Sequence, residues 1–584
     1  MKILFLTTSF NGMAQRAWLE LDRLNLQVRV QIATGPEAME AAAAAFAPDL
    51  VIAPFLKAKI PESIWKNHTC LVVHPGIRGD RGSSSLDWAI LNEEKEWGVT
   101  ILQAAEKMDA GDIWAWRTFP MRPASKACLY RHEVTQVAME ALLEAVARFQ
   151  EPDFRPQPLD YSDPTVRGNW NRRTSSDDFR FFWTDDTASI LRKARAADSD
   201  PGLPVEWFGR RFAGFAGHAE SHLRGTPGAL LAQRHGAICA ATGDGAIWLT
   251  HLREETEDAV KLPALLALGE AASHLPESVL DPFQPIEGET FREIWYEEEG
   301  AAGFLHFDFY NGAMSTDQCS RLLAALREAK RRPVKVIALM GGPDIWSNGI
   351  HLNVIEAAES PAEESWANIQ AIDDLILEII QSPNHYIISA MQGNAGAGGV
   401  PMALAADKVL ARKGIVLNPH TRNMGLYGSE YWTYLLPRRI GTEKARQFTE
   451  ECLPWGVALA KEIGLIDDCF GETAQEFALQ VKQIAGEIAA LPYFDKLLLA
   501  KRFQRRKDEA FKPLEAYRRE ELERMRRNFF DDDEDYHYKR YCFVHKIQET
   551  TRGQLVEERD WYSSRRKIYR RRKWESVGYR GEQP

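Results

Sequence analysis

The chain opens with an apolar run that leads directly into a turn, and residues 2–12 read KILFLTTSFNG. Continuous apolar runs of this length are typical of strands that are buried on both faces. Further segments continue the pattern, with strands expected at residues 27–33, 49–54 and 70–73 and an alanine-rich helix at residues 37–47. Strands that alternate with helices predict a parallel, doubly wound sheet, in which ligands bind at the carboxyl ends of the strands.

Length and composition indicate a multidomain globular protein. The chain has 584 residues, too many for one hydrophobic core, and its apolar fraction of 45% is ordinary. No apolar run reaches the ~18 residues of a membrane span, and the first strand is too short for a signal peptide. The seven cysteines have no metal-ligand spacing. We therefore expect reduced thiols in a cytoplasmic protein without a metal site or a membrane contact.

Changes of pattern divide the chain into four predicted parts. A Pro- and Asp-rich break at residues 151–165 ends an α/β domain at residues 1–165. Residues 166–275 hold short strands and an Asp-Gly hairpin signal, which predict a small β-barrel-like domain. Residues 276–490 return to alternating strands and helices, and residues 491–584 form a charged helical tail.

The tail differs from the body in charge. Residues 501–584 hold 24 Lys and Arg and 17 Asp and Glu, a net charge of +7, whereas the whole chain carries −11. Residues 565–573 interleave bases with aromatics, a pattern that alone suggests RNA binding. The acidic segments before them favour instead a solvated helix or one that packs on the body, and we expect no nucleic-acid partner. A third use is pairing with anions of a bound ligand.

Two polar residues mark the first candidate site. His74 follows a predicted strand, and Asp109 lies in the tight loop DAGD (residues 109–112). The imidazole can shuttle a proton while a carboxylate fixes its tautomer. Arg81, Gly82 and the helix that begins near Ser84 offer N–H groups to an anionic or polar ligand. Asp109 is also compatible with a purely structural role in a turn.

Residues 1–165 resemble the catalytic domain of methionyl-tRNA and glycinamide-ribonucleotide formyltransferases, and residues 170–255 resemble the C-terminal barrel of the former. The matching motifs lie in order along the chain: HP (74–75), RG (81–82), WAI (88–90), GVT (98–100) and DAGD (109–112). The resemblance implies N10-formyltetrahydrofolate as formyl donor and His74 with Asp109 as the catalytic pair.

One departure from the formyltransferase pattern concerns the formyl oxygen. The family has an asparagine two residues before the histidine, and this chain has Val72. Formylation of an ordinary amine is therefore in doubt, and Asn11 or Gln15 is a candidate substitute for the missing amide. Arg131 is expected either to pair with the glutamate tail of folate or to be a solvated helix charge.

A second candidate site consists of two glycine-flanked loops, WSNGIH (residues 346–351) and GNAGAGG (residues 393–399). Each can aim a backbone N–H at one carbonyl oxygen, and such a pair stabilises an oxyanion. Residues 300–490 resemble the enoyl-CoA hydratase/isomerase (crotonase) superfamily, which implies coenzyme A as ligand and the N–H groups of Ile350 and Gly398 as the oxyanion hole. The resemblance places Ala313 and His351 among the expected CoA contacts.

The acid–base residues of a hydratase are absent from the second site. Pro401 and Thr421 stand where hydratases have glutamates, so enoyl hydration is not expected. Tyr427 and Glu430 are instead polar groups in an aromatic stretch. They either act on the acyl group, or Glu430 pairs with Arg438 and the aromatics belong to the core.

The order of these parts closely resembles one family, the hydrogenase maturation factors HypX (HoxX). The resemblance implies transfer of the formyl group to CoA, decarbonylation of formyl-CoA, and delivery of CO to the iron of a [NiFe]-hydrogenase, with maturation proteins as possible partners. Two alternatives remain open. One is a formyltransferase for an unknown amine with an independent acyl-CoA domain, and the other is a scaffold that binds folate and CoA.

Overall fold

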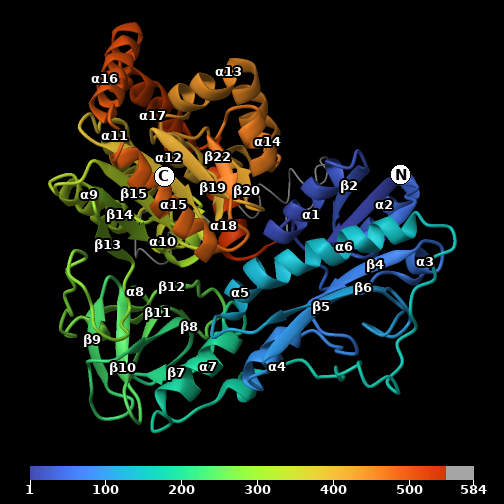
Figure 1. Cartoon of the computed structure of the whole chain (residues 1–584). Coiled ribbons are helices and arrows are strands. Elements are labelled where there is room, and N and C mark those ends of the chain that lie inside the picture. Colours follow the sequence, from blue (N-terminus) through green and yellow to red (C-terminus); the bar gives the residue numbers. More distant parts are fainter. Residues whose placement is uncertain (548–584) are drawn as a thin grey trace, which may run out of the picture.

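The computed structural model describes residues 1–547 and contains three domains arranged around a common centre (Figure 1). The N-terminal domain (blue to cyan) lies beside a small β domain (green), and the third domain (yellow to red) contacts both. The basic run at residues 565–573 lies outside the described residues. Two features position the candidate sites: the sheet of the first domain and the loops of the third.

The N-terminal domain is built on one six-stranded sheet in the order β2-β1-β3-β4-β5-β6. Its strands are β1 (Lys2–Thr7), β2 (Gln27–Ile32), β3 (Leu50–Ala53), β4 (Cys70–His74), β5 (Glu96–Gln103) and β6 (Ile113–Pro120). Its helices are α1 (Gly12–Asp22), α2 (Pro36–Phe46), α3 (Glu62–Trp65), α4 (Ser85–Leu91), α5 (Lys126–Leu129), the π-helix η1 (Tyr130–Val134) and α6 (Thr135–Phe149). The first four strands of this order are parallel as predicted, but β5 runs antiparallel to both of its neighbours, β4 and β6, and forms a hairpin with β6.

The second domain is a five-stranded antiparallel sheet in the order β7-β8-β11-β10-β9, with β12 paired to β11. Its elements are η2 (Ser176–Phe179), α7 (Thr187–Ala197), β7 (Leu203–Trp207), β8 (Arg210–Glu220), β9 (Leu230–Arg234), β10 (Ala237–Ala241), β11 (Ala246–Glu254), β12 (Leu262–Pro263), α8 (Ala264–Leu268) and η3 (Gly269–Ala272). Helix α7 buries Ile190, Leu191 and Ala194 against the sheet. The hairpin signal at Asp244 marks the turn between β10 and β11.

The third domain contains two sheets, ordered β13-β14-β15-β17-β19-β22 and β16-β18-β20-β21. Its strands are β13 (Ile294–Glu299), β14 (Ala302–Phe307), β15 (Val336–Gly341), β16 (Ile345–Ser347), β17 (Tyr386–Met391), β18 (Asn394–Gly396), β19 (Lys408–Arg412), β20 (Val416–Asn418), β21 (Trp455–Gly456) and β22 (Asp468–Phe470). Its helices are η4 (Tyr310–Gly312), α9 (Thr316–Ala329), α10 (Leu352–Ala357), α11 (Pro361–Ile380), α12 (Gly399–Leu404), η5 (Thr421–Met424), α13 (Trp432–Glu451), α14 (Val457–Glu462) and α15 (Ala474–Ala489).

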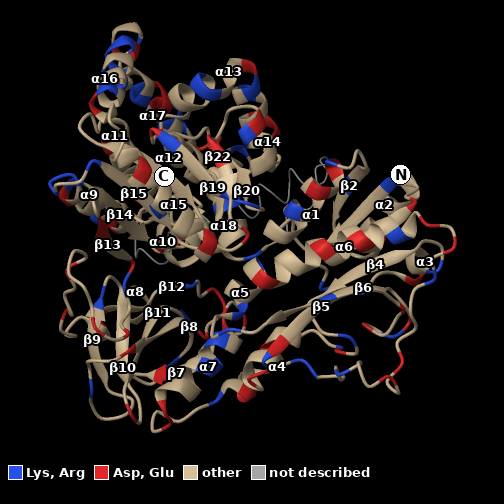
Figure 2. Cartoon of the chain, in the orientation of Figure 1, with Lys and Arg blue, Asp and Glu red and all other residues tan. Residues whose placement is uncertain are grey.

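The C-terminal segment is helical as predicted, in α16 (Phe494–Phe511), α17 (Leu514–Phe530) and α18 (Tyr536–Val544). The sequence predicts that this segment is a separate tail that begins at residue 491. In the structure α17 packs on α11 and α13 (Figure 1), and it buries Leu514, Met525 and Phe529 in clusters shared with the third domain. Charges of both signs cover the exposed faces of α16 (Figure 2), and all three helices also supply core residues, among them Phe494 and Leu498 of α16.

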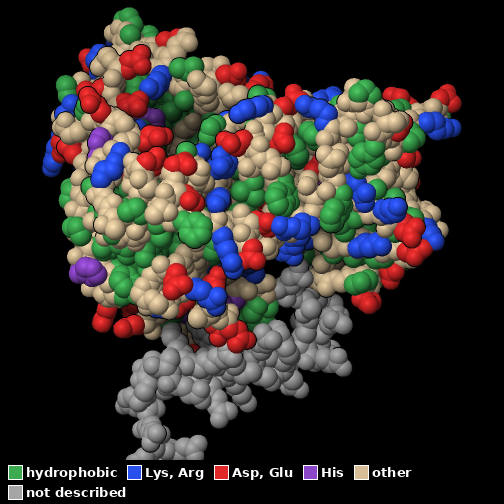
Figure 3. All heavy atoms as spheres, turned by 90° about the horizontal axis from the view of Figure 1, so that it is seen from below, with side chains coloured by type: hydrophobic (Ala, Val, Ile, Leu, Met, Phe, Trp, Pro, Cys, Tyr) green, Lys and Arg blue, Asp and Glu red, His purple; other side chains and the backbone are tan. Residues whose placement is uncertain are grey.

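The surface and the cysteines show no special pattern. Basic, acidic and apolar side chains are interspersed on the face seen in Figure 3, as is usual for globular domains. All seven cysteines lie within the described residues, and none of them forms a disulfide there. None of the described helices combines the length and the apolar character that crossing a bilayer requires.

Candidate functional site

One cavity of about 1220 Å³ extends from the first predicted site to the edge of the second, where it ends at Asn348 and Gly396. Its walls include Asn11, His74 and Asp109 from the first domain. They also include Asn348, Gly396 and His420 from the third domain. Seven Lys and Arg residues line it against four Asp: Arg16, Lys57, Lys59, Lys126, Arg131, Arg173 and Arg412, with Asp87, Asp109, Asp200 and Asp344. The excess of positive charge suits an anionic ligand.

His74 ends β4 and lies buried between two carboxylates. Its Nε2 is 2.8 Å from Oδ2 of Asp80, and its Nδ1 is 3.8 Å from Oδ1 of Asp109. Burial lowers the pKa of His74, but the hydrogen bond with Asp80 and the charges of Asp109 and Asp80 outweigh it, so the pKa is raised above its usual value. The predicted His74–Asp109 pair is therefore a wider ion pair, and the hydrogen-bonded partner is Asp80, which sequence analysis missed.

Asp80 is held by several groups. Ser85 Oγ donates to Oδ2 of Asp80 at 2.6 Å, and Asn171 Nδ2 donates to Oδ1 at 3.4 Å. The turn needs Gly76, since a Cβ at that position would lie 2.3 Å from Oδ2 of Asp80 and 2.5 Å from Nε2 of His74. The sequence signal was thus the glycine that follows His74 and Pro75, because it leaves room for a carboxylate beside the imidazole.

Asp109 occupies a loop that other residues fix in place. It has a φ of 55°, and its Oδ2 accepts a hydrogen bond from the Gly82 N–H at 3.2 Å. Arg81 donates through Nε and Nη2 to the carbonyl of Met108. Arg81 and Gly82, predicted as ligand contacts, thus hold the Asp109 loop, and of the two only Gly82 lines the cavity.

The candidate replacements for the missing amide both line the cavity beside Val72. Asn11 caps α1 through Oδ1, which accepts from the Ala14 N–H at 3.0 Å, and its Nδ2 is 3.4 Å from the Tyr130 hydroxyl. Gln15 donates through Nε2 to the carbonyl of Phe10 at 2.7 Å. Asn11 therefore has the more weakly engaged amide and is the better placed donor for a ligand oxygen.

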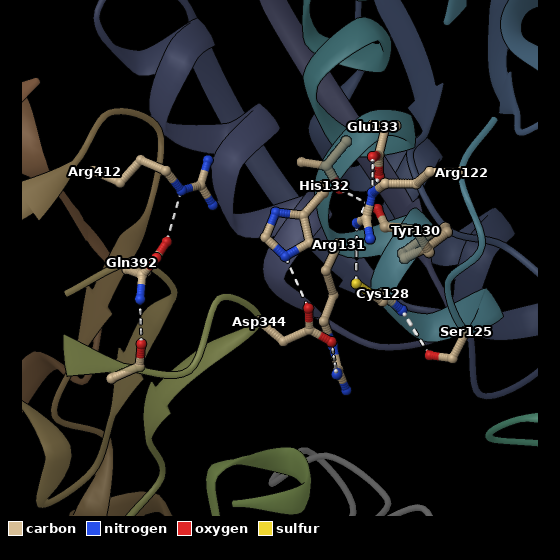
Figure 4. Close-up of polar contacts among 12 residues, drawn as sticks. Arg122, Ser125, Cys128, Tyr130, Arg131, His132, Glu133, Asp344, Gln392 and Arg412 are labelled. Carbon is tan, nitrogen blue, oxygen red and sulfur yellow. Dashed lines mark hydrogen bonds and ion pairs between the residues drawn. The ribbon is translucent and has the colours of Figure 1, made fainter. Parts of the chain in front are cut away.

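Arg131 connects the first domain to the third. Its guanidinium lies 3.1 Å from Oδ2 of Asp344 and donates to Oδ1 of Asn311 at 2.7 Å, and His132 Nε2 lies 2.8 Å from Oδ1 of Asp344 (Figure 4). The residue is thus neither a solvated helix charge nor unpaired. Both Arg131 and Asp344 line the cavity, so a ligand carboxylate or phosphate would compete with Asp344 for the guanidinium.

The same region brings together the donor set Cys128, His132 and Asp344, whose ligand atoms lie within 4.8 Å of one another. Sulfur, imidazole and carboxylate ligands suit Zn²⁺. However, Arg122 donates to Sγ of Cys128 at 3.1 Å, and Arg131 holds Asp344 (Figure 4). Two guanidinium charges beside the ligand atoms oppose a divalent cation, so the cluster is better suited to holding the domains together.

The two glycine loops of the third domain meet as predicted. A Cβ on Gly349 would lie 3.3 Å from the backbone nitrogen of Gly398, so the loops are in contact. Within the described part of the chain, neither the Ile350 N–H nor the Gly398 N–H donates to another residue. Asn368 fixes the first loop, because its side chain accepts from the His351 N–H at 3.0 Å and donates to the carbonyl of Met314. Two unengaged N–H groups on rigid loops have the form of an oxyanion hole.

Glu430 lies against this pair of loops. A Cβ on Gly398 would lie within 2 Å of Oε1 of Glu430, so the carboxyl group touches the loop. Burial, and secondarily the charge of Asp373, raise the pKa of Glu430 to about 8. The group is therefore a neutral acid at pH 7. It does not pair with Arg438, which lies 3.0 Å from Asp508.

The other predicted residues of the second site are farther from the cavity. The Tyr427 ring is half-buried beside Trp432 and beneath the guanidinium of Arg524, and burial raises the pKa of its hydroxyl. His351 uses Nδ1 to cap α10 at the Val354 N–H. Ala313, His351, Ile350 and Gly398 do not line the cavity, which ends at Asn348 and Gly396.

Comparison with known proteins finds a family for each of three consecutive parts of the chain. Three family models match: formyl transferase at residues 23–146, formyl transferase C-terminal domain at residues 173–267, and enoyl-CoA hydratase/isomerase at residues 310–540. The last match extends through α17 and into α18. The predicted fold, two formyltransferase-type domains followed by a crotonase-type domain, is confirmed.

Similarity to whole proteins covers nearly all of the chain. The hydrogenase maturation factor HoxX of Bradyrhizobium diazoefficiens is 46% identical over 94% of this chain and 95% of that protein. The crystal structure of HypX from Aquifex aeolicus in complex with tetrahydrofolic acid superposes with a TM-score of 0.91 at 46% identity, over 94% of this chain and 97% of that one. Methionyl-tRNA formyltransferase of Roseiflexus castenholzii is 32% identical over 30% of this chain and 56% of its own length.

Proposed function

The chain belongs to the HypX/HoxX family of hydrogenase maturation factors, and from this premise we propose that it transfers the formyl group of N10-formyltetrahydrofolate to CoA and releases CO from formyl-CoA. The observation that carries the proposal is the cavity shared by His74 and the loop at Gly396. Through this cavity a formyl thioester formed beside His74 would reach the loop that precedes Gly398.

In the first step the thiol of CoA attacks the formyl carbon. The new bond is C–S, the bond that breaks is the one from the formyl carbon to N10, and the thiol proton ends on N10. His74 moves that proton, while Asp80 and Asp109 orient the imidazole and stabilise its charged form. A thiol gives up its proton more readily than an amine, which fits the absence of the amide at Val72. Asn11 is our candidate donor to the formyl oxygen.

In the second step formyl-CoA divides into CO and CoA. The N–H groups of Ile350 and Gly398 hold the thioester oxygen and polarise the carbonyl. Glu430 donates its proton to sulfur as the C–S bond breaks, and the formyl hydrogen then leaves as a proton to the Glu430 carboxylate. No atom is lost, because one thioester yields one CO and one thiol. Glu430 suits this exchange because it is held neutral.

The wider role follows from the family. Hydrogenase maturation is the process named for the HoxX relative, and we propose that the CO becomes the carbonyl ligand of the iron in a [NiFe]-hydrogenase. Hydrogenase maturation proteins are the expected partners, and the cytoplasm is the expected site, since seven cysteines without a disulfide among the described residues suit a reducing compartment.

The proposal is tested with purified protein, N10-formyltetrahydrofolate and CoA, with CO followed by a haem reporter and tetrahydrofolate by chromatography. Equal amounts of CO and tetrahydrofolate, with CoA recovered unchanged, are expected. Tetrahydrofolate production that needs an added amine and gives no CO would support the alternative formyltransferase. Tight binding of both ligands without turnover would support the scaffold.

A bulky side chain at the Asn348 end of the cavity should separate the two steps. Asn348 lines the cavity, is exposed to it, and donates through Nδ2 to the carbonyl of Asn311. We expect Asn348→Trp to lower CO release by about 10²-fold, because misplacing a reacting group by about an ångström has that effect. Tetrahydrofolate affinity, measured by calorimetry, should not change. Asn348→Ala loses the same hydrogen bond without filling the space. If both variants lose equal activity, passage of the formyl thioester beside Asn348 is contradicted.

A further inference from the structure

Two buried carboxyl groups hold the short segment that carries Glu430, which is itself buried. Glu430 and Tyr431 are consecutive non-glycine residues with φ of 63° and 57°, a conformation that side chains disfavour. Such strain persists only where neighbouring groups hold it. In this fold the holding groups are Asp373 in α11 and Glu521 in α17, neither of which is near residue 430 in sequence.

Asp373 holds the first half of the turn. Its Oδ1 accepts from the Glu430 N–H at 2.8 Å, and its Oδ2 accepts from the Ser429 hydroxyl at 2.8 Å. The side chain is fully buried. Glu430 completes the arrangement, because its own Oε2 accepts from the Ser429 N–H, which leaves Oε1 directed at Gly398.

Glu521 holds the second half. Its Oε2 accepts from the Tyr431 N–H at 2.9 Å, and its Oε1 accepts from the Thr433 N–H at 2.8 Å and from the Thr433 hydroxyl. Within residues 1–547 these hydrogen bonds all go to the start of α13, and the Glu521 side chain is fully buried. Helix α17 supplies a second hydrogen-bond acceptor, since Asn528 Oδ1 accepts from the Tyr427 N–H at 2.9 Å.

The charges around Glu430 are unbalanced. The titratable groups packed near it are Asp373 from α11, Cys319 from α9 and Glu521 from α17. The cation beside them is Arg518, which lies 3.9 Å from Asp373 and 2.7 Å from the exposed Asp374. Three ionised carboxylates with one partly engaged guanidinium would repel one another at short range, so the cluster retains protons at neutral pH.

We propose that Asp373 and Glu521 are positioning residues of the second site, which hold the turn at residues 429–433 and so direct Glu430 at the Gly398 loop, so that α17 of the C-terminal segment completes this site. The role of Glu430 in this inference rests on the proposed function. The contacts that position it do not.

The expected pH response follows from the charges. Burial and the Asp373 charge raise the pKa of Glu430 to about 8, so Glu430 donates a proton below that pH and loses the ability above it. Removing the Asp373 charge in Asp373→Asn should therefore lower the pKa of Glu430 and move the alkaline loss of CO release to lower pH. We expect a shift of about one pH unit, the scale on which neighbouring carboxyls interact.

The test measures the protonated carboxyl band of Glu430 by infrared difference spectroscopy in the full-length protein, with Glu430→Gln to identify the band. In Asp373→Asn the band should disappear at lower pH than in the unaltered chain. In Glu521→Gln an acceptor oxygen becomes a donor, so the band should shift in frequency and broaden, and CO release should fall about tenfold. Glu520→Gln is the matched control, since Glu520 is exposed on the same helix and pairs with Lys512.

The outcomes separate this inference from the proposed function. If Asp373→Asn leaves the band and the pH profile unmoved while activity falls, or if Glu521→Gln behaves like Glu520→Gln, the positioning role is overturned. If the unaltered chain releases no CO, the proposed function fails, and the titration of the infrared band still decides whether Asp373 and Glu521 position Glu430.

Discussion

Replacement of His74 by alanine should abolish formyl transfer. The imidazole is the group in the first site that can take the thiol proton and return it to N10, and positioned proton transfer contributes about 10²- to 10⁴-fold. We expect His74→Ala to lower tetrahydrofolate production by that factor. Decarbonylation of formyl-CoA supplied directly should continue, because the second site is unaltered. Loss of both activities together would show that the change disturbs the fold or the cavity.

The role of Asp80 gives this prediction a pH test. The pKa of His74 is raised in the folded protein by the Asp80 hydrogen bond and by the charges of Asp109 and Asp80. A base must be unprotonated to act, so the rate should rise with pH through this raised pKa. Asp80→Asn removes one source of the increase, so the rising limb should move to lower pH while the maximal rate falls. Asp87→Asn is the comparison, since Asp87 lines the same cavity but does not contact His74.

Local patterns in the sequence predicted the frame of the molecule well. The strand expected at residues 70–73 covers Cys70–His74, and the alanine-rich helix expected at residues 37–47 covers Pro36–Phe46. Both depend on the periodicity of apolar residues, which is a local property. The two glycine-flanked loops that the sequence predicts to form an oxyanion hole were recognised because backbone N–H sites need glycine at fixed positions. The approach of Gly349 to Gly398 agrees with that reading.

Residues that act across long sequence distances could not be found in this way. Arg131 meets Asp344 across 213 positions, and Glu521 meets Tyr431 across 90. In both cases the charged residue stands in a helix whose spacing carries no sign of its partner. Glu521 was counted with a charged tail, expected either to be solvated or to pack on the body, because the residues around it are charged, and its own side chain is completely buried. Asp80 was missed for a different reason. Asp109 matches a known motif, so it was assigned as the carboxylate partner of His74.

Glu430→Gln should stop the second step and leave the first intact. Glutamine keeps the shape of the side chain but carries no transferable proton, so we expect CO release to fall by about 10²-fold or more and formyl-CoA to accumulate. Tetrahydrofolate should still form in a first turnover, in an amount equal to the enzyme. Rapid quench with mass spectrometry of the CoA thioesters measures both quantities in one experiment.

Tyr427→Phe distinguishes the two candidate acids of this site. Tyr427 lies in a cluster with Leu426 and Met525, and its hydroxyl has a raised pKa, so it is a poor proton donor at neutral pH. Glu430 is the side chain nearest to a Cβ built at Gly398, whereas the Tyr427 ring lies beside Trp432 and Arg524. We therefore expect Tyr427→Phe to retain CO release within about threefold, since it removes one hydroxyl from a well-packed position. A loss as large as that of Glu430→Gln would reassign the proton to tyrosine, and unchanged CO release in Glu430→Gln would remove Glu430 from the mechanism.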